Sequence, residues 1–199
     1  MIPKEGCNVG DYVLTAEPFL GRYERSYKAV KLREIYDVAV VSAAIPLGKE
    51  TASQKAIKAA FGVTMPNVGR STLSKDENMR LVRLGIDQLF IIFPRAQKDA
   101  GAEPHTAKIL GGGFYTTDQS DVWVTLELSG AGARRALERI CPLDLMPESF
   151  GIGAAARTTM EHLGTIIIRN DADSFLLMSA SSSAQSFLLA LETSIINTA

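Results

Sequence analysis

The segment Glu127–Ile140, ELSGAGARRALERI, contains the change of pattern around which the chain is organised. The residues that lead into it, Val122–Leu128, are rich in β-branched and aromatic side chains and predict a strand. Residues 130–140 carry apolar side chains at helical spacing and predict a helix. Gly130 and Gly132 lie between the two patterns. A strand, a small-residue loop and a helix therefore follow one another, which is also the order found in phosphate-binding loops.

This loop lacks the remaining residues of a nucleotide site. A dinucleotide fingerprint needs a third glycine three positions after Gly132, where helix and strand approach closely, and that position holds Arg135. The Gly-Lys-Ser/Thr sequence of a P-loop is absent as well. We interpret the loop as a turn, with Ser129 as the N-cap of the helix, and predict no cofactor-binding residue in it.

Working outward, the chain divides into an N-terminal arm and two halves. The arm covers residues 1–31, the first α+β half covers residues 32–110 and the second covers residues 111–199. In each half, strands flank a helix, which predicts an α+β protein made of two small sandwich-like halves. Residues 95–113 have a loop-like composition that closes with a glycine triplet. The expected strands are 35–45, 79–85, 88–94, 121–128, 154–160, 164–169 and 173–179, with a tight turn at Gly85–Asp87. The expected helices are 49–62, 130–140 and 183–196. Ser182 and Gln185 predict a capping box for the last helix, and Phe187, Leu188, Leu191 and Ile195 share one of its faces.

Composition excludes several classes of protein. The 21 Lys and Arg residues nearly cancel the 22 Asp and Glu residues, so no basic field attracts nucleic acid or an anionic membrane. The longest apolar run, near Val38–Ile45, is far shorter than the roughly 20 residues that span a bilayer, and the start has no signal peptide. Cys7 and Cys141 are isolated thiols and predict neither a zinc site nor a disulfide framework. These features favour a cytoplasmic protein that binds neither nucleic acid nor membrane.

No arrangement of residues in the sequence carries catalysis. His105 and His162 lie in separate loops and form no ligand pair, so we predict no metal site. Cys141 precedes Pro142 in an apolar setting, which favours a buried, inert thiol. The remaining candidates are loop carboxylates and a glycine triplet, for which solvation, capping or a flexible joint is the simpler interpretation: Asp118, Asp121, Asp144, Glu148 and Gly111–Gly113. We therefore predict no catalytic residue.

The arm has more aromatic bulk than a free tail needs. Tyr12, Phe19, Tyr23 and Tyr27 are spread through charged sequence, and aromatic side chains gain stability only when they are buried. Either the arm packs on its own domain or it lies on another protein. Aromatic residues together with Arg are enriched at interfaces, so we predict these four residues as a partner interface.

The second half resembles a known family. Leu-Ser-Gly-x-Gly-Ala-Arg before a helix (Leu128–Arg134), Cys-x-Leu-Asp-Leu-x-Pro-x-x-Phe after it (Cys141–Phe150) and Ala156 with Thr158 are similar to the γ subunit of heterotetrameric sarcosine oxidase. Leu84, Gly85 and Asp87 fit the family's strand pair, and the arm's EPF also fits. The resemblance covers about residues 15–197. Ile86 and Leu89 depart from it, because the family favours Pro and Trp there.

The resemblance implies a place in a larger enzyme. The complex has α, β, γ and δ chains and oxidatively demethylates sarcosine to glycine, with hydrogen peroxide and either formaldehyde or 5,10-methylenetetrahydrofolate as products. The complex is expected to carry FAD, FMN and NAD, with tetrahydrofolate as co-substrate, and none of these in this chain. The γ chain is similar to the folate-binding fold of aminomethyltransferases, with ferredoxin-like elements, and its implied role is structural and non-catalytic.

Two other functions remain open at this point. The chain could be a folate-binding, aminomethyltransferase-like protein, which would need a carboxylate aimed at the folate, and no motif identifies one. It could also be a binding module whose arm recruits some other protein. Closely similar γ chains could serve complexes that oxidise other N-methyl amino acids, because the resemblance assigns the substrate site to the β chain.

Overall fold

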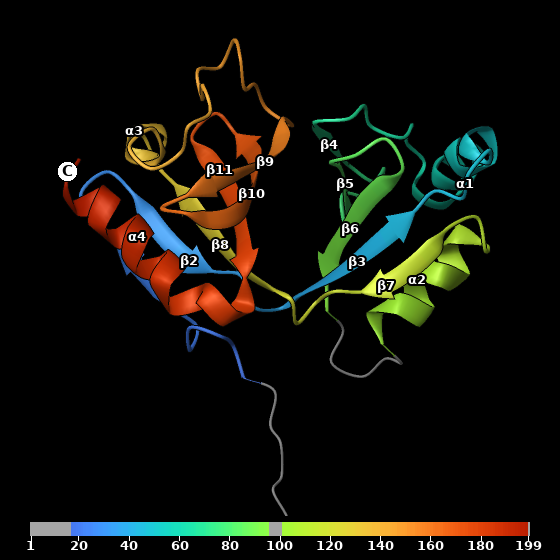
Figure 1. Ribbon diagram of the computed structural model, residues 1–199, viewed down its shortest axis with the longest axis horizontal. Coiled ribbons are helices and arrows are strands. Elements are labelled where there is room, and N and C mark those ends of the chain that lie inside the picture. The colour runs from blue at the N-terminus through green and yellow to red at the C-terminus, as the bar shows by residue number, and fades with distance from the viewer. Residues whose placement is uncertain (1–16, 96–100, 199) are drawn as a thin grey trace, which may run out of the picture.

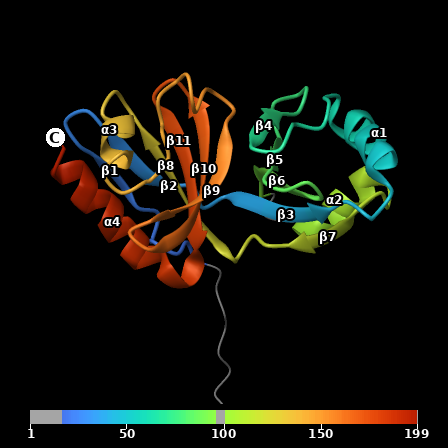
Figure 2. The ribbon, with the colours of Figure 1, turned by 45° about the horizontal axis from the view of Figure 1, so that its top comes forward.

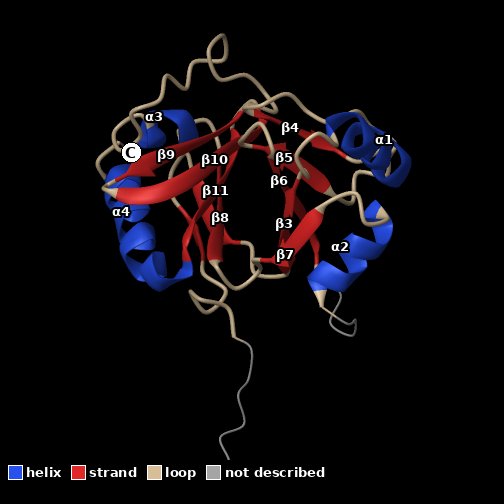
Figure 3. Ribbon diagram, turned by 45° about the vertical axis from the view of Figure 1, so that its right-hand side comes forward, coloured by secondary structure: helices blue, strands red, loops and turns tan. Residues whose placement is uncertain are grey.

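The computed structural model describes residues 17–95 and 101–198. Two antiparallel sheets face each other, and each has a pair of helices on its outer side (Figures 1 and 3). The layers are therefore helix, sheet, sheet and helix. The fold is α+β, as the sequence predicts, and within the described ranges no helix is long and apolar enough to cross a membrane.

The six-stranded sheet takes strands from both ends of the chain. Its order is β1-β2-β8-β11-β10-β9, with every neighbouring pair antiparallel. The strands are β1 (Glu24–Ser26), β2 (Lys31–Glu34), β8 (Trp123–Ser129), β9 (Ala155–Met160), β10 (Leu163–Asp171) and β11 (Ser174–Ala180). The predicted strands 121–128, 154–160, 164–169 and 173–179 correspond to β8, β9, β10 and β11.

The five-stranded sheet is continuous in sequence. Its order is β4-β5-β6-β3-β7, again antiparallel throughout. The strands are β3 (Val38–Ala44), β4 (Arg70–Leu73), β5 (Arg80–Arg83), β6 (Gln88–Pro94) and β7 (Tyr115–Asp118). The predicted hairpin at Gly85–Asp87 joins β5 to β6 and is confirmed.

Alternation along the strands divides the core into three layers. In β6, Leu89, Ile91 and Phe93 pack under the helices of the five-stranded sheet, whereas Phe90 and Ile92 point toward the other sheet. A side-chain period of two places consecutive residues on opposite faces, and here both faces are buried. The cluster between the sheets contains β6 together with residues of β3, β5, β9, β10 and β11. Figure 2 shows the two sheets side by side.

The four α-helices within residues 17–95 and 101–198 cover the outer faces. They are α1 (Glu50–Phe61), α2 (Ala102–Leu110), α3 (Ala133–Leu137) and α4 (Ala184–Ile196). The predicted α1 is confirmed, with Gly62 ending it in the left-handed conformation at φ 71°. The predicted apolar face of α4 is confirmed too, because Phe187, Leu188, Leu191 and Ile195 are all buried.

Three local expectations are wrong. Residues 102–110 form α2 where a loop is expected, and Pro104 is tolerated because it lies in the first turn, where its missing N–H has no helical acceptor. The helix after the Gly130 loop covers only Ala133–Leu137, with Gly132 rather than Ser129 at its N-cap. The predicted capping box of Ser182 and Gln185 is absent, because a 3₁₀ turn over Ser181–Ser183 precedes α4.

The division into an arm and two halves also differs from the observed topology. Of the predicted arm 1–31, the described part from residue 17 includes β1 and the start of β2, and β2 pairs with β8. The six-stranded sheet therefore joins residues 24–34 to the second half, and β7, predicted within 111–199, belongs to the five-stranded sheet through its pairing with β3. Hydrogen bonding to β8 and to β3, rather than position along the chain, determines which sheet β2 and β7 join.

Candidate functional site

The Gly130–Gly132 loop is filled by the chain itself. A Cβ on Gly130 would lie 2.5 Å from the carbonyl oxygen of Ala29, and one on Gly132 would lie 2.8 Å from a methyl group of Val30. The two glycine amides donate to the carbonyls of Asp173 and Ala29, at 2.9 and 3.1 Å. The glycines thus admit the turn between β1 and β2, and their N–H groups are not directed at a ligand.

The Cys141–Phe150 segment is organised by a buried arginine. The Arg169 guanidinium donates to the carbonyls of Leu145 (3.3 Å) and Phe150 (2.8 Å), and also to that of Ala172 (2.5 Å). It stacks 5.3 Å from the ring centroid of Phe175. The most distinctive motif of the second half is therefore a packed loop whose carbonyls are satisfied from within.

The remaining residues of that motif also have internal partners. Burial raises the pKa of the Cys141 thiol, against weaker opposing hydrogen bonds, so the thiol is neutral at neutral pH. Asp144 accepts hydrogen bonds from Ser149 Oγ at 2.5 Å and the Met146 amide at 3.0 Å, which lower its pKa. Leu145 is fully buried and Leu143 is partly buried, whereas Pro142 is exposed.

The other candidate residues lie apart. His105 is on α2 of the five-stranded half, and His162 is in the left-handed turn between β9 and β10. Asp118 accepts two hydrogen bonds from Ser120 that outweigh burial and lower its pKa, while Asp121 and Glu148 are exposed. Among the residues that the structure describes, no three His, Cys, Asp or Glu side chains gather in a way that could hold a metal ion.

The arm tyrosines contact the last helix of the same chain. The hydroxyls of Tyr23 and Tyr27 each donate to Glu192 Oε1 at 2.7 Å, and Arg25 forms an ion pair with the same oxygen at 3.1 Å. The tyrosine hydrogen bonds lower the pKa of Glu192, and burial is the main cause that raises the pKa values of both tyrosines. Tyr23 and Tyr27 are thus bound within the domain, whereas Tyr12 lies outside the described residues.

Glu192 was not predicted, although the sequence contains a signal for it. Glu192 is the single charged residue of α4, Ala184–Ile196. A lone carboxylate in such a helix suggests a specific partner, because an ionised group near an apolar surface is costly without one.

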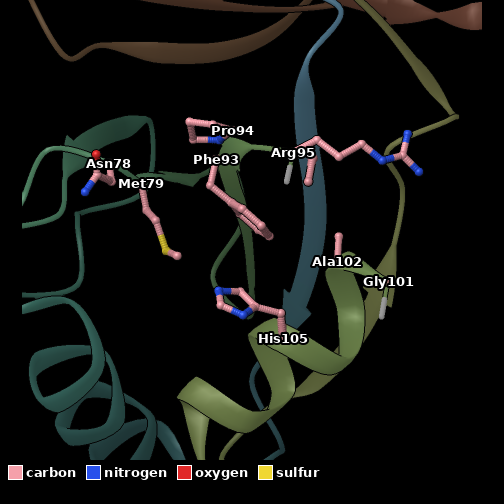
Figure 4. A pocket seen from close by; sticks show the side chains of 9 residues that line it. Asn78, Met79, Phe93, Pro94, Arg95, Gly101, Ala102 and His105 are labelled. Carbon is pink, nitrogen blue, oxygen red and sulfur yellow. The ribbon is translucent and has the colours of Figure 1, made fainter. Parts of the chain in front are cut away.

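Figure 4 shows a cavity of about 430 Å³ on the outer face of the five-stranded sheet. Met79, Phe93 and His105 point toward one another across it, and Arg95 points away. The His105 ring lies 5.6 Å from that of Phe93. None of the described residues that line the cavity is acidic.

A second concave region lies where the chain passes between the sheets. This groove, of about 470 Å³, is lined by residues of the β2–β3 connection, including Tyr36, and by Asp121 of the β7–β8 connection. Phe19 and Tyr36 line it and are 42% and 47% exposed. Arg22 lies 5.2 Å from the centroid of the Tyr36 ring. Among the predicted interface residues that the structure describes, Phe19 therefore faces an open surface, whereas Tyr23 and Tyr27 contact α4.

Sequence comparison relates the chain to one family. Residues 47–196 match the sarcosine oxidase, gamma subunit family. The sarcosine oxidase subunit gamma of an Arthrobacter species is 30% identical over 151 residues, which cover 75% of this chain and 72% of that protein. The corresponding subunit of Corynebacterium sp. (strain P-1) is 28% identical over 153 residues, covering 75% and 71% of the two chains.

Structural comparison gives the same fold. A chain of the heterotetrameric sarcosine oxidase from Corynebacterium sp. U-96, in complex with pyrrole 2-carboxylate, superposes with a TM-score of 0.72 and 22% identity, over 87% of both chains. Aminomethyltransferase T of the glycine cleavage system from Bartonella henselae superposes with a TM-score of 0.62 and 16% identity, over 82% of this chain and 45% of that one. The expected likeness to the aminomethyltransferase fold is thereby confirmed. On the sequence match, which spans most of its length, the chain belongs to the sarcosine oxidase gamma subunit family.

Proposed function

We propose that this chain is the non-catalytic γ subunit of a sarcosine-oxidase-type complex and that it acts in assembly. The observation that carries the proposal is the family match over residues 47–196. Two features of the chain support an assembly role. The glycine loop, which has the order of a phosphate-binding loop, and the Cys141–Phe150 segment, the most distinctive family motif, are both occupied by the chain's own groups.

In this proposal the chemistry belongs to the other chains. The α, β and δ subunits would carry FAD, FMN and NAD and would use tetrahydrofolate, and the assembled cytoplasmic enzyme would demethylate sarcosine. The γ chain would supply surface that holds these subunits in register. A related complex that acts on another N-methyl amino acid would need the same contribution from its γ chain.

A folate site on this chain is the alternative with less support. The fold is shared with aminomethyltransferase T, but shared fold does not carry a site with it. The cavity beside His105 has no carboxylate among its described lining residues, and the alternative function requires one aimed at the folate. We therefore expect at most weak binding of tetrahydrofolate by the isolated chain, and titration calorimetry measures it.

The groove that contains Phe19 and Tyr36 is the surface we assign to a neighbouring subunit, most simply α. Its two aromatic side chains are half exposed, and Arg22 supports the Tyr36 ring from one side. Aromatic residues held in a concave, rigid setting are the side chains that dominate binding energy at protein interfaces. Tyr23 and Tyr27 hydrogen-bond Glu192 of their own chain, so Phe19 is the predicted interface residue on which we base this proposal.

The test is co-expression of the tagged chain with the other subunits encoded by the same host. Recovery of a flavin-bearing complex that produces peroxide from sarcosine would support the proposal, and a panel of N-methyl amino acids would identify the preferred substrate. The chain alone should be colourless and should release no peroxide. Stoichiometric flavin absorbance in the isolated chain, or its failure to recover any larger subunit, would overturn the proposal.

A further inference from the structure

Three of the most exposed large apolar side chains lie at one end of the five-stranded sheet. Leu47 is 99% exposed, Ile86 is 78% exposed and Tyr115 is 72% exposed. Leu47 lies in the turn before α1, Ile86 lies between β5 and β6, and Tyr115 is the first residue of β7. We call these three residues the loop-end patch.

Strand register brings the three residues to the same end of the sheet. Ala44, at the end of β3, is opposite Gln88 on one side and Tyr115 on the other. The Ile45 amide donates to the Asp87 carbonyl at 2.7 Å, so Ile86 and Leu47 follow directly beyond this end. Adjacent strands are about 4.8 Å apart, which keeps the three residues within one contact surface. In Figure 1 this is the end of β3 that carries the arrowhead.

The backbone beneath the patch is fixed by hydrogen bonds. Arg83 donates to the carbonyls of Gly85 (3.3 Å), Ile86 (2.5 Å) and Pro66 (3.3 Å), which holds the β5–β6 hairpin. An exposed apolar side chain adds nothing to folding, yet a rigid one binds a partner with little loss of conformational entropy.

The Leu47 turn is fixed in the same way. Pro46–Lys49 is a β-turn closed by a 3.0 Å bond from the Lys49 amide to the Pro46 carbonyl, with Gly48 at φ 73°. A left-handed third residue is the requirement of a type II turn, and it presents Leu47 outward.

The groove assigned above lies at the opposite end of the same strand. Val38, at the start of β3, lines the groove, and Ala44 ends the strand at the loop-end patch. Seven extended residues span roughly 20 Å, so the groove and the patch are two separate contact surfaces.

We infer that the loop-end patch is a second contact of this chain with the larger subunit that occupies the groove, through an apolar surface of that subunit. This inference rests on the proposed function. The charged side chains near the patch are of mixed sign, so the complementary surface is apolar rather than strongly charged: Lys49, Glu50, Arg83, Asp87 and Arg157. The partner presents shallow pockets, because turns and a strand end project outward.

Area and symmetry argue against a second copy of this chain. Three side chains offer on the order of a few hundred Å², well below the roughly 800 Å² that each partner buries in a stable pair. Insertion of the patch into the cavity beside His105 of another copy would be a head-to-tail contact, which forms open filaments rather than a closed dimer. A larger subunit that also occupies the groove satisfies both conditions.

The test uses the co-expressed complex and two serine variants. One carries Leu47→Ser, Ile86→Ser and Tyr115→Ser. The matched control carries Leu189→Ser and Ile196→Ser, which are 64% and 59% exposed on α4. We expect the patch variant to keep the parent melting temperature and to bind the other subunits about tenfold more weakly or worse, while the control binds within about twofold of the parent. Assembly should persist in 0.5 M salt, because apolar contacts are not screened.

The outcomes separate the two claims. Ile86→Lys, on the hairpin held by Arg83, gives a second probe if the triple variant folds poorly, and it should weaken binding likewise. Parent-like binding by both folded variants overturns the inference while the proposed function stands. A homodimer of the isolated chain that the triple variant abolishes overturns the choice of partner. Failure of the parent chain itself to recover other subunits overturns the proposed function and the inference together.

Discussion

The two halves of the molecule are built alike but close their helical layers differently. In the six-stranded half, α3 and α4 pack together, with Ser194 Oγ donating to the Ala136 carbonyl at 2.6 Å in the buried interior. In the five-stranded half, α1 and α2 also contact each other, but the cavity beside His105 lies on the outer face between the sheet and α2.

The difference follows from side-chain size on the helices. The buried face of α4 includes Phe187, Leu188, Leu191 and Ile195. The buried residues of α2 are only Thr106 and Leu110. Large apolar side chains on a helix fill the space against a sheet. A helix whose buried side chains are few, small or polar leaves a cavity there. The comparison teaches that the sheets set the architecture and the helices set how tightly each half is closed.

The largest expected effect compares two buried phenylalanines. Phe150→Ala, in the six-stranded half, should reduce the free energy of unfolding by about 3–5 kcal/mol, because it leaves a void among packed residues. Phe61→Ala should reduce it by about 2–3 kcal/mol, since Phe61 already lines a hollow beside Lys75 and is less closely packed. Urea denaturation of both variants measures the difference. A larger loss for Phe61→Ala would contradict the comparison.

Two glycines give the next effect. Gly130→Ala, with φ 110° and a backbone oxygen 2.5 Å from the new Cβ, should cost about 3 kcal/mol. Gly111→Ala at the end of α2, with φ 60° and open space around it, should cost about 1 kcal/mol. Thermal unfolding of the two variants checks whether the steric cost of a Cβ is larger in the six-stranded half. Equal losses would show that the β1–β2 turn yields easily.

The bond between the arm and α4 should give a pH-dependent effect. The pKa of Glu192 is lowered, chiefly by the Tyr23 hydrogen bond, so the ionised carboxylate stabilises the fold above its ordinary pKa and loses this contribution as pH falls below about 4.3. The raised pKa of Tyr23 places the upper limit of the same bond above about pH 10. Glu192→Gln should therefore cost about 1 kcal/mol at pH 7 and less at pH 3.

The control for that series is Glu148→Gln, which changes an exposed carboxylate of the same half. Its unfolding free energy should follow the parent at both pH values. If Glu192→Gln also follows the parent at pH 7, the three hydrogen-bonding groups around Glu192 do not hold the arm in solution.

The smallest effect on stability is expected at the groove. Phe19→Ser should change the free energy of unfolding by less than about 0.5 kcal/mol, because the side chain is 42% exposed. Recovery of the complex should nevertheless fall. Tyr36→Ser tests the opposite side of the same groove, and parent-like assembly by both variants would move the contact elsewhere.

Elements with a strong period and a local stop signal could be predicted from the sequence. Helix α1 ends at Gly62, and the hairpin turns at Gly85–Asp87, because in both cases nearby residues determine the backbone conformation. Helix α4 has four large apolar residues on one face, so its burial was also predictable.

Elements that depend on distant partners could not be predicted. Strand β2 reads Lys-Leu-Arg-Glu, and its pattern becomes intelligible only next to β8, where Arg33 pairs with Glu127 at 2.6 Å. Helix α2 begins beside Gly101 and Pro104, residues that usually mark a loop. In each case tertiary contact outweighs local preference.

The same limit applies to the candidate site. The sequence supported the interpretation that the Gly130 loop only turns the chain, but the reason, contact with Ala29, is a long-range one. Aromatic composition predicted a partner interface in the arm but not the hydrogen bonds of Tyr23 and Tyr27 to Glu192 of their own chain. Arg169 ends the apolar run of β10, and that irregular position was the signal that could have marked it.

The order in which the strands occur along the chain has a consequence for synthesis on the ribosome. Residues 38–118 contain every strand of the five-stranded sheet, so this sheet has all its partners once that stretch has emerged. The hairpin of β1 and β2 emerges first, yet it must wait for β8 and then for Glu192 on the last helix. Long waits of this kind leave apolar residues such as Leu32 uncovered in a growing chain. A nascent chain stalled before α4 should therefore have a protease-resistant centre and a protease-sensitive beginning.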